Sequence, residues 1–196
     1  MITSQQVNAL RTKTGLGMMD CKRALEESNG NEDMAIDILR KKGIAKAGEK
    51  ATRETAQGLV VSYIHTNNTI GVLVEVNCET DFVARTEGFQ QFCQDIAMHV
   101  AATNPLYLSP ADVSPELLEK EGEIYVEQMK NENKPADMIK KIVDSKLKKF
   151  AEESSLMTQN FVKNPEITIE QYAKEMISKT GENIQIKRFA RFSLTA

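Results

Sequence analysis

Two segments in which apolar and polar residues alternate constrain the fold of this 196-residue chain more than any other feature. Residues 58–66 and 69–79 are rich in Val and Ile, and only Asn67-Asn68 separates them. Asparagine tolerates the positive φ angles of a tight turn, so the pattern predicts an antiparallel hairpin. One face of its second strand carries Ile70, Val72, Val74 and Val76.

Helical periodicity flanks this hairpin on both sides. Residues 3–43 contain three short helical segments separated by glycines that can end a helix, and we expect Gly43 to close the third. Residues 87–102 form a helix whose apolar stripe is broad enough to cover the sheet. Further helices are expected at about 116–132, 136–153 and 168–179, the first two as a helical hairpin.

The closing run, residues 183–194, alternates again and predicts a third strand, with one side formed by Ile184, Ile186, Ala190, Phe192 and Leu194. The predicted fold class is therefore α+β: a three-helix N-terminal module followed by a three-stranded antiparallel sheet packed with helices. We assign residues 1–53 to the module and a basic linker, and residues 54–196 to the α+β core. An apolar content of 41% can fill such a core.

The charge balance argues against a dedicated nucleic-acid binder, because a formal net charge of −3 leaves no excess of Lys and Arg. Residues 40–53 are nevertheless basic, with Glu49 as the single acidic residue. We interpret them as a solvated linker helix. The alternative is contact with nucleic acid or the ribosome, although no aromatic residue is interleaved to stack on bases. The basic residues are Arg40, Lys41, Lys42, Lys46, Lys50 and Arg53.

The sequence contains neither catalytic nor cofactor-binding motifs. We interpret the two histidines, His65 and His99, as structural, and no GxxxxGK[ST] or GxGxxG loop is present to hold a phosphate. Three cysteines without a CxxC pair indicate neither a disulfide framework nor a metal site. Without a signal peptide or a run of eighteen apolar residues, we expect a cytoplasmic protein with no membrane anchor, no cofactor and no bond chemistry of its own.

Two longer stretches carry a family resemblance. They are residues 10–22, LRTKTGLGMMDCK, and residues 75–84, EVNCETDFVA. In this order and at this separation they resemble the elongation factor Ts family. The similarity continues through FQQF at 89–92 and GENI at 181–184 to Arg188-Phe189, and therefore covers essentially the whole chain.

Members of this family release GDP from the GTPase elongation factor Tu, and the resemblance implies that function here. It also implies an N-terminal module similar to ubiquitin-associated domains, which contacts the nucleotide domain of elongation factor Tu through Leu10, Met18 and Met19. The loop that disturbs the Mg²⁺ site of the partner corresponds to Thr80, Asp81, Phe82 and Val83. The alternative is a chaperone or tether that binds elongation factor Tu without promoting exchange.

Longer family members resemble two tandem copies of the sheet layer with a protruding coiled coil, whereas this chain contains one copy. The resemblance therefore implies a homodimer. Such a dimer presents two equivalent surfaces and can bind two elongation factor Tu molecules.

The residues of the loop and the module suit this work on physical grounds. Moving the Phe82 ring from water into a gap in a partner is worth roughly 1.5 to 3 kcal/mol, which is one or two powers of ten in affinity. The residues alone leave another interpretation open, in which Thr80 or Asp81 caps the next helical turn and Phe82 fills the core. Met18 and Met19 are adjacent at the head of a helix and cannot both point inward, so one should be exposed.

Overall fold

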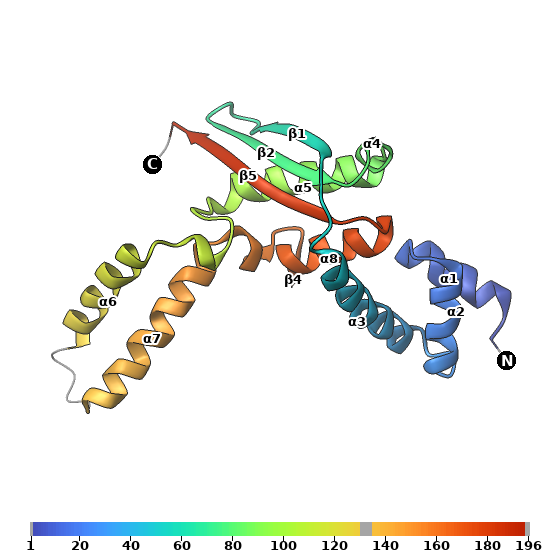
Figure 1. The fold of residues 1–196 in the computed structure, drawn as a ribbon, viewed down its shortest axis with the longest axis horizontal. Coiled ribbons are helices and arrows are strands. Elements are labelled where there is room, and N and C mark those ends of the chain that lie inside the picture. Colours follow the sequence, from blue (N-terminus) through green and yellow to red (C-terminus); the bar gives the residue numbers. More distant parts are fainter. Residues whose placement is uncertain (1, 130–134, 195–196) are drawn as a thin grey trace. The chain divides into compact units, whose positions relative to one another are not determined.

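Figure 1 shows the computed structural model, which describes residues 2–129 and 135–194. The fold class is α+β as predicted, with N-terminal helices and a three-stranded antiparallel sheet of strand order β1-β2-β5. The chain divides into two compact units. The first contains Met1–Val61, Val74–Asp95 and Gln171–Lys187, and the second contains Ser62–Leu73, Ile96–Glu170 and Arg188–Ala196.

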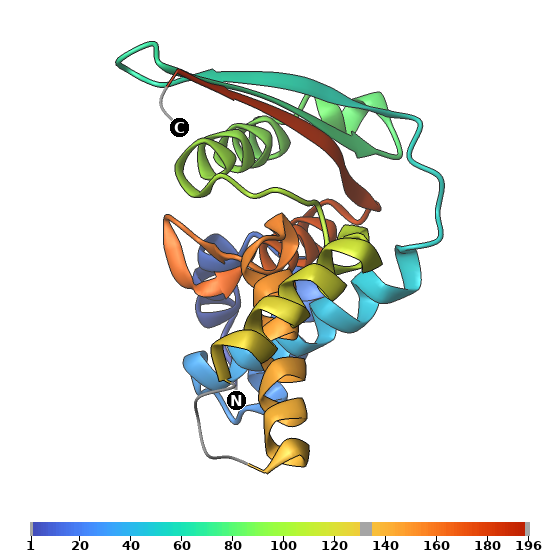
Figure 2. The same cartoon turned by 90° about the vertical axis from the view of Figure 1, so that its left-hand side faces the viewer.

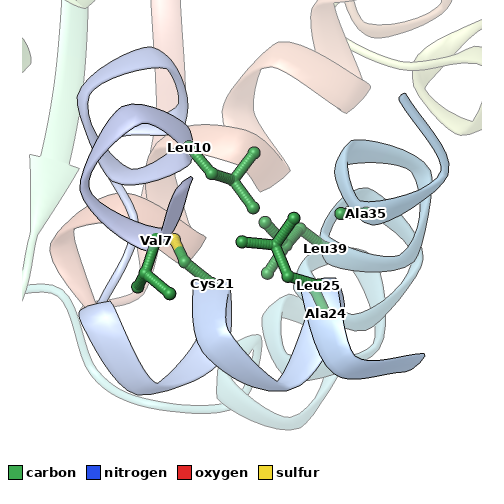
Figure 3. Close-up of a cluster of buried hydrophobic side chains, with 7 residues drawn as sticks. All are labelled: Val7, Leu10, Cys21, Ala24, Leu25, Ala35 and Leu39. Atoms are coloured by element: carbon green, nitrogen blue, oxygen red, sulfur yellow. The ribbon is translucent and has the colours of Figure 1, made fainter. Parts of the chain in front are cut away.

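Three helices form the N-terminal module: α1 (Ser4–Thr14), α2 (Met18–Glu27) and α3 (Glu32–Lys50). The Thr3 hydroxyl accepts a hydrogen bond from the Gln6 amide and the Gln6 side chain accepts one from the Thr3 amide, so α1 begins with a capping box. Asn31 caps α3 by accepting a hydrogen bond from the Met34 amide. The apolar faces meet in one core, drawn in Figure 3, which consists of Val7, Leu10, Cys21, Ala24, Leu25, Ala35 and Leu39.

The third helix does not end at Gly43, so that prediction is wrong. Helix α3 continues to Lys50, because a glycine inside a helix costs only about 1 kcal/mol and need not stop it. A Cβ atom at position 43 would lie 2.9 Å from the Ser178 hydroxyl of α8 (Ile169–Thr180). The glycine therefore permits close packing of α3 on α8, a requirement that the local sequence does not reveal.

At least four of the six basic residues in the segment 40–53 bind groups of their own chain, while the side chain of Lys46 lies outside the described part. The contacts pair Arg40 with Glu175, Lys42 with Glu27, Lys50 with the Gly181 carbonyl and Arg53 with Glu79, at 2.6 to 3.5 Å. Such surface pairs add little stability. They do give these basic side chains partners within the chain, which leaves them less available to the phosphates of a nucleic acid. The interpretation as a solvated helix is therefore favoured over a nucleic-acid contact.

The predicted hairpin is confirmed as β1 (Gln57–Ile64) and β2 (Ile70–Cys78). Its turn places Asn68 at a φ of 57°, and the His65 amide donates to the Ile70 carbonyl at 2.9 Å. The chain leaves β2 and enters α5 (Glu87–Thr103) after one short helix. Every member of the predicted apolar stripe on α5 is buried: Phe89, Phe92, Cys93, Ile96, Ala97 and Val100.

The third strand, β5 (Ile184–Ser193), is present, but its predicted single apolar face is wrong in the C-terminal half. Ile184 and Ile186 are buried as expected. The alternation then changes phase: Lys187 and Arg188 are both exposed, after which Ala190, Phe192 and Leu194 are exposed and Phe189, Arg191 and Ser193 are half-buried. The Arg191 Nε donates to the Ala101 carbonyl of α5 at 3.3 Å, so in this half of the strand an odd-numbered side chain contacts α5.

Helices α6 (Pro115–Met129) and α7 (Ala136–Glu153) lie side by side in the second unit, as Figure 2 shows. Met129 and Val143 are buried, and the Lys146 ammonium lies 5.1 Å from the centre of the Tyr125 ring. The predicted helical hairpin is therefore confirmed. Its connection, predicted at 131–135, lies outside the described residues except for Pro135.

The remaining elements of the second unit are two short 3₁₀ helices, η1 (Pro110–Asp112) and η2 (Leu156–Thr158), and the paired strands β3 (Asn160–Phe161) and β4 (Asn164–Thr168). His99 of α5 is fully buried beside this sheet. Its Nδ1 accepts a hydrogen bond from the Val162 amide at 3.3 Å, and its Nε2 lies 3.1 Å from Gln159 Oε1. Burial lowers the pKa of His99, so the neutral ring serves packing, in agreement with the structural role predicted for it.

Candidate functional site

A four-residue helix, α4 (Asp81–Ala84), carries the predicted loop directly after β2. Thr80 precedes it in an extended conformation, and its hydroxyl accepts a hydrogen bond from the Val83 amide at 3.4 Å. Asp81 lies in the first turn, where a carboxylate is favoured by the free amides of the helix, and pairs with Arg85 at 2.9 Å. Thr80 is therefore the N-cap of α4, one of the roles that the sequence left open.

Phe82 points away from the interior of the protein. It is 80% exposed, whereas Ala84 on the same short helix is buried. The core of the first unit is occupied by Phe89 and Phe92, which are fully buried. The interpretation in which Phe82 fills the core is therefore wrong, and its ring is free to contact another molecule.

The carboxylate of Glu182, in the turn between α8 and β5, binds the base of this loop. It accepts hydrogen bonds from the Glu79 amide at 3.1 Å, the Thr80 amide at 3.0 Å and the Thr80 hydroxyl at 2.6 Å. Sequence reasoning did not select Glu182, because 102 positions separate it from Thr80. The only signal for it in the sequence is its place in the GENI stretch.

The cysteines near the loop are not reactive groups. Cys78 and Cys93 are buried, and burial raises the pKa of both thiols, that of Cys93 to about 12. The Cys78 thiol donates to the Thr80 carbonyl at 3.1 Å. A buried thiol with a raised pKa is a poor nucleophile, so these residues support packing rather than chemistry.

The second predicted contact region, at the start of α2, is only partly on the surface. Met18 and Met19 are 47% and 57% exposed, so both methionines reach solvent where we expected at least one. Leu10 is fully buried in the module core shown in Figure 3. Its side chain packs among the other core residues and offers no exposed surface to a partner, so the contact predicted for Leu10 is not visible on the surface of the module.

Within residues 2–129 and 135–194, no group of three or more His, Cys, Asp or Glu side chains is arranged to hold a metal ion. Among the helices of the same part of the chain, none is long and apolar enough to cross a membrane.

Fold and loop together define an α+β protein with an N-terminal three-helix module and an exposed aromatic side chain at the end of its central strand. A family model described as elongation factor TS matches residues 12–195. The chain is 53% identical to elongation factor Ts of Desulfosudis oleivorans over 98% of both chains. It is 54% identical to that of Thermosipho melanesiensis over 99% of both, and 55% identical to that of Carboxydothermus hydrogenoformans over 99% of this chain and 89% of that protein. The chain therefore belongs to the elongation factor Ts family of translation elongation factors.

Proposed function

We propose that this chain is a guanine-nucleotide exchange factor that accelerates GDP release from elongation factor Tu during translation in the cytoplasm. The observation that carries the proposal is the outward-pointing Phe82 ring on a capped four-residue helix. Membership of the elongation factor Ts family supports the choice of partner. The factor needs no bond chemistry of its own, because it acts by binding one state of the GTPase better than another.

The proposed mechanism is a linkage between two binding events. If the factor binds nucleotide-free elongation factor Tu more tightly than the GDP form, GDP release is favoured by the same free-energy difference. Phe82 supplies this difference by entering a gap that opens as the nucleotide leaves. Asp81 brings a carboxylate close to the Mg²⁺ site of the partner, while Thr80 and Val83 hold the ring and the carboxylate in place.

A second contact is proposed for the N-terminal module. Met18 and Met19 offer two flexible, exposed thioether side chains, which adapt well to the surface of a partner. They would rest on the nucleotide domain of elongation factor Tu. Leu10 contributes to this contact indirectly, since it packs in the core that holds the helices of the module together.

Stopped-flow release of fluorescent GDP from elongation factor Tu tests the proposal. We expect the release rate to rise with the concentration of the factor and to saturate. The alternative function, a chaperone or tether, predicts binding of elongation factor Tu without any change in the release rate. Binding with an unchanged release rate would therefore overturn the exchange function in favour of the tether.

We also propose that two chains form a homodimer through residues 54–196, while residues 1–53 form the separate module. In the second unit, the neighbouring strands of the sheet expose Ile64 and Leu73 together with Phe192, which is 71% exposed, and Leu194, which is 84% exposed. An apolar patch of this kind on a soluble chain is typical of an interaction surface. A second copy is a suitable occupant, because a two-fold axis brings the same patch against itself.

Phe192→Glu is expected to separate the dimer into single chains, because it places two carboxylates in an apolar interface. Sedimentation at micromolar concentration should give about twice the 21.9 kDa chain mass for the wild type and the chain mass for the variant. Thr12→Glu adds the same charge on the exposed side of α1 and should leave the dimer intact. A wild-type protein that sediments as a single chain contradicts the homodimer.

A further inference from the structure

We propose that Glu182 is a positioning residue that holds the Phe82 loop in the conformation that engages the partner. This inference rests on the proposed exchange function. The loop itself is short: α4 has only four residues and cannot hold its own position through internal hydrogen bonds. The placement of α4 therefore depends on hydrogen bonds made by the residues just before it. Glu182 accepts three of these hydrogen bonds, from the Glu79 amide, the Thr80 amide and the Thr80 hydroxyl.

The Thr80 hydroxyl connects Glu182 to α4. The hydroxyl donates its proton to Glu182 Oε1 at 2.6 Å. With the proton held there, an oxygen lone pair remains free to accept the hydrogen bond from the Val83 amide at 3.4 Å. Glu182 thus orients the side chain that caps the helix carrying Phe82.

Glu182 also binds the backbone before α4, and its three hydrogen bonds to Glu79 and Thr80 are called the clamp. Glu182 Oε2 accepts from two consecutive amides, those of Glu79 and Thr80, which link β2 to α4. Hydrogen bonds to an ionised carboxylate are shorter and stronger than neutral ones. The direction in which the chain leaves β2, and hence the direction of the Phe82 ring, is set by this carboxylate.

The segment that carries Glu182 is itself held in place by hydrogen bonds. Its neighbour Asn183 donates its backbone amide to Glu79 Oε1 at 2.6 Å, so each of the two segments binds a carboxylate of the other. The Asn183 side chain donates to the Arg53 carbonyl at 2.7 Å, and the Lys50 ammonium donates to the Gly181 carbonyl at 2.6 Å. All these groups lie in the first unit, so the clamp is a fixed part of that unit.

This arrangement predicts a kinetic signature that differs from that of a contact residue. If the clamp is lost, the loop samples other conformations, and the apparent affinity for the partner falls by the fraction of time spent in the competent one. Once the partner is saturated, Phe82 is in place and the maximal release rate is preserved. Loss of Glu182 should therefore raise the half-saturating concentration of the factor and leave the maximal rate nearly unchanged.

The test uses the 196-residue chain and the stopped-flow release of fluorescent GDP from elongation factor Tu. Glu182→Ala is expected to raise the half-saturating concentration about tenfold, equivalent to about 1.4 kcal/mol, with a maximal rate within about twofold of the wild type. Glu182→Gln retains one carbonyl oxygen and should give an intermediate rise of about threefold. In the free protein, hydrogen exchange at the Glu79 and Thr80 amides should be faster in Glu182→Ala than in the wild type. Glu153→Ala, an exposed glutamate on α7, is the matched control and should change neither measurement.

The possible outcomes separate the positioning role from the exchange function. An active wild type together with unchanged half-saturation and unchanged amide exchange in Glu182→Ala overturns the positioning role alone. A large fall in the maximal rate, with an unchanged half-saturating concentration, also overturns it. If Glu182→Ala does not fold, a Glu182→Gln variant that behaves as the wild type overturns it as well. A wild type that releases no GDP overturns the exchange function, and the positioning role with it.

Discussion

Phe82→Ala is expected to lower the maximal rate of GDP release from elongation factor Tu by about tenfold or more while leaving the protein folded. The ring is 80% exposed in the free chain, and in the proposed mechanism it is buried only as the nucleotide leaves, so its loss acts on the release step more than on the first binding of the partner. Losing the burial of a phenylalanine side chain removes roughly 1.5 to 3 kcal/mol, which corresponds to one or two powers of ten. A surface substitution changes the free energy of unfolding by only about 0.5 kcal/mol, so the thermal midpoint should stay close to that of the wild type.

A matched control distinguishes the position of the ring from its general hydrophobicity. Leu106→Ala removes another exposed apolar side chain, 61% exposed, from a segment outside the loop. It is expected to leave the release rate unchanged. Phe82→Leu keeps part of the apolar surface and should fall between the alanine variant and the wild type. If Phe82→Ala releases GDP as fast as the wild type, the loop does not perform the exchange.

Hydrophobic periodicity was sufficient to predict where most elements of the fold lie. The hairpin, the apolar stripe of α5 and the helical hairpin follow from local spacing, and the turn asparagine Asn68 has the positive φ that its residue type suggests. Both errors concern features that local spacing does not indicate. Gly43 lies against Ser178 of α8, and the burial pattern of β5 changes phase after Ile186.

The candidate site could be predicted only in part. The family resemblance contributed more to that prediction than the residue types and their spacing did. The residues alone left Phe82 open to two interpretations, core or surface, and only its exposure in the folded chain separates them. The resemblance implied a partner contact through Leu10, whereas helical spacing with Val7 predicts an inward position for its side chain, and the structure has it buried there. Glu182 could not be selected, since no local pattern indicates which carboxylate will meet the amides of Glu79 and Thr80.

Leu10→Ala is expected to destabilise the N-terminal module by about 2 to 5 kcal/mol. The side chain is fully buried among the helices of the module, as Figure 3 shows, and its removal leaves a cavity there. The core of the module is small, so the loss is a large share of what holds it together. Thermal denaturation followed by circular dichroism should show a lower midpoint, and amide exchange in α1 and α2 should be faster.

Met19→Ala provides the contrasting case, because Met19 is 57% exposed at the head of α2 and packs little within its own chain. It is expected to change the free energy of unfolding by only about 0.5 kcal/mol while raising the half-saturating concentration for GDP release severalfold, through the loss of an adaptable contact. Leu10→Ala should raise the same concentration only at temperatures where the module unfolds, since its effect passes through stability. The contrary result would be an equal rise of the half-saturating concentration in both variants at a low temperature at which the module is folded in both. That result would show that Leu10 takes a direct part in binding.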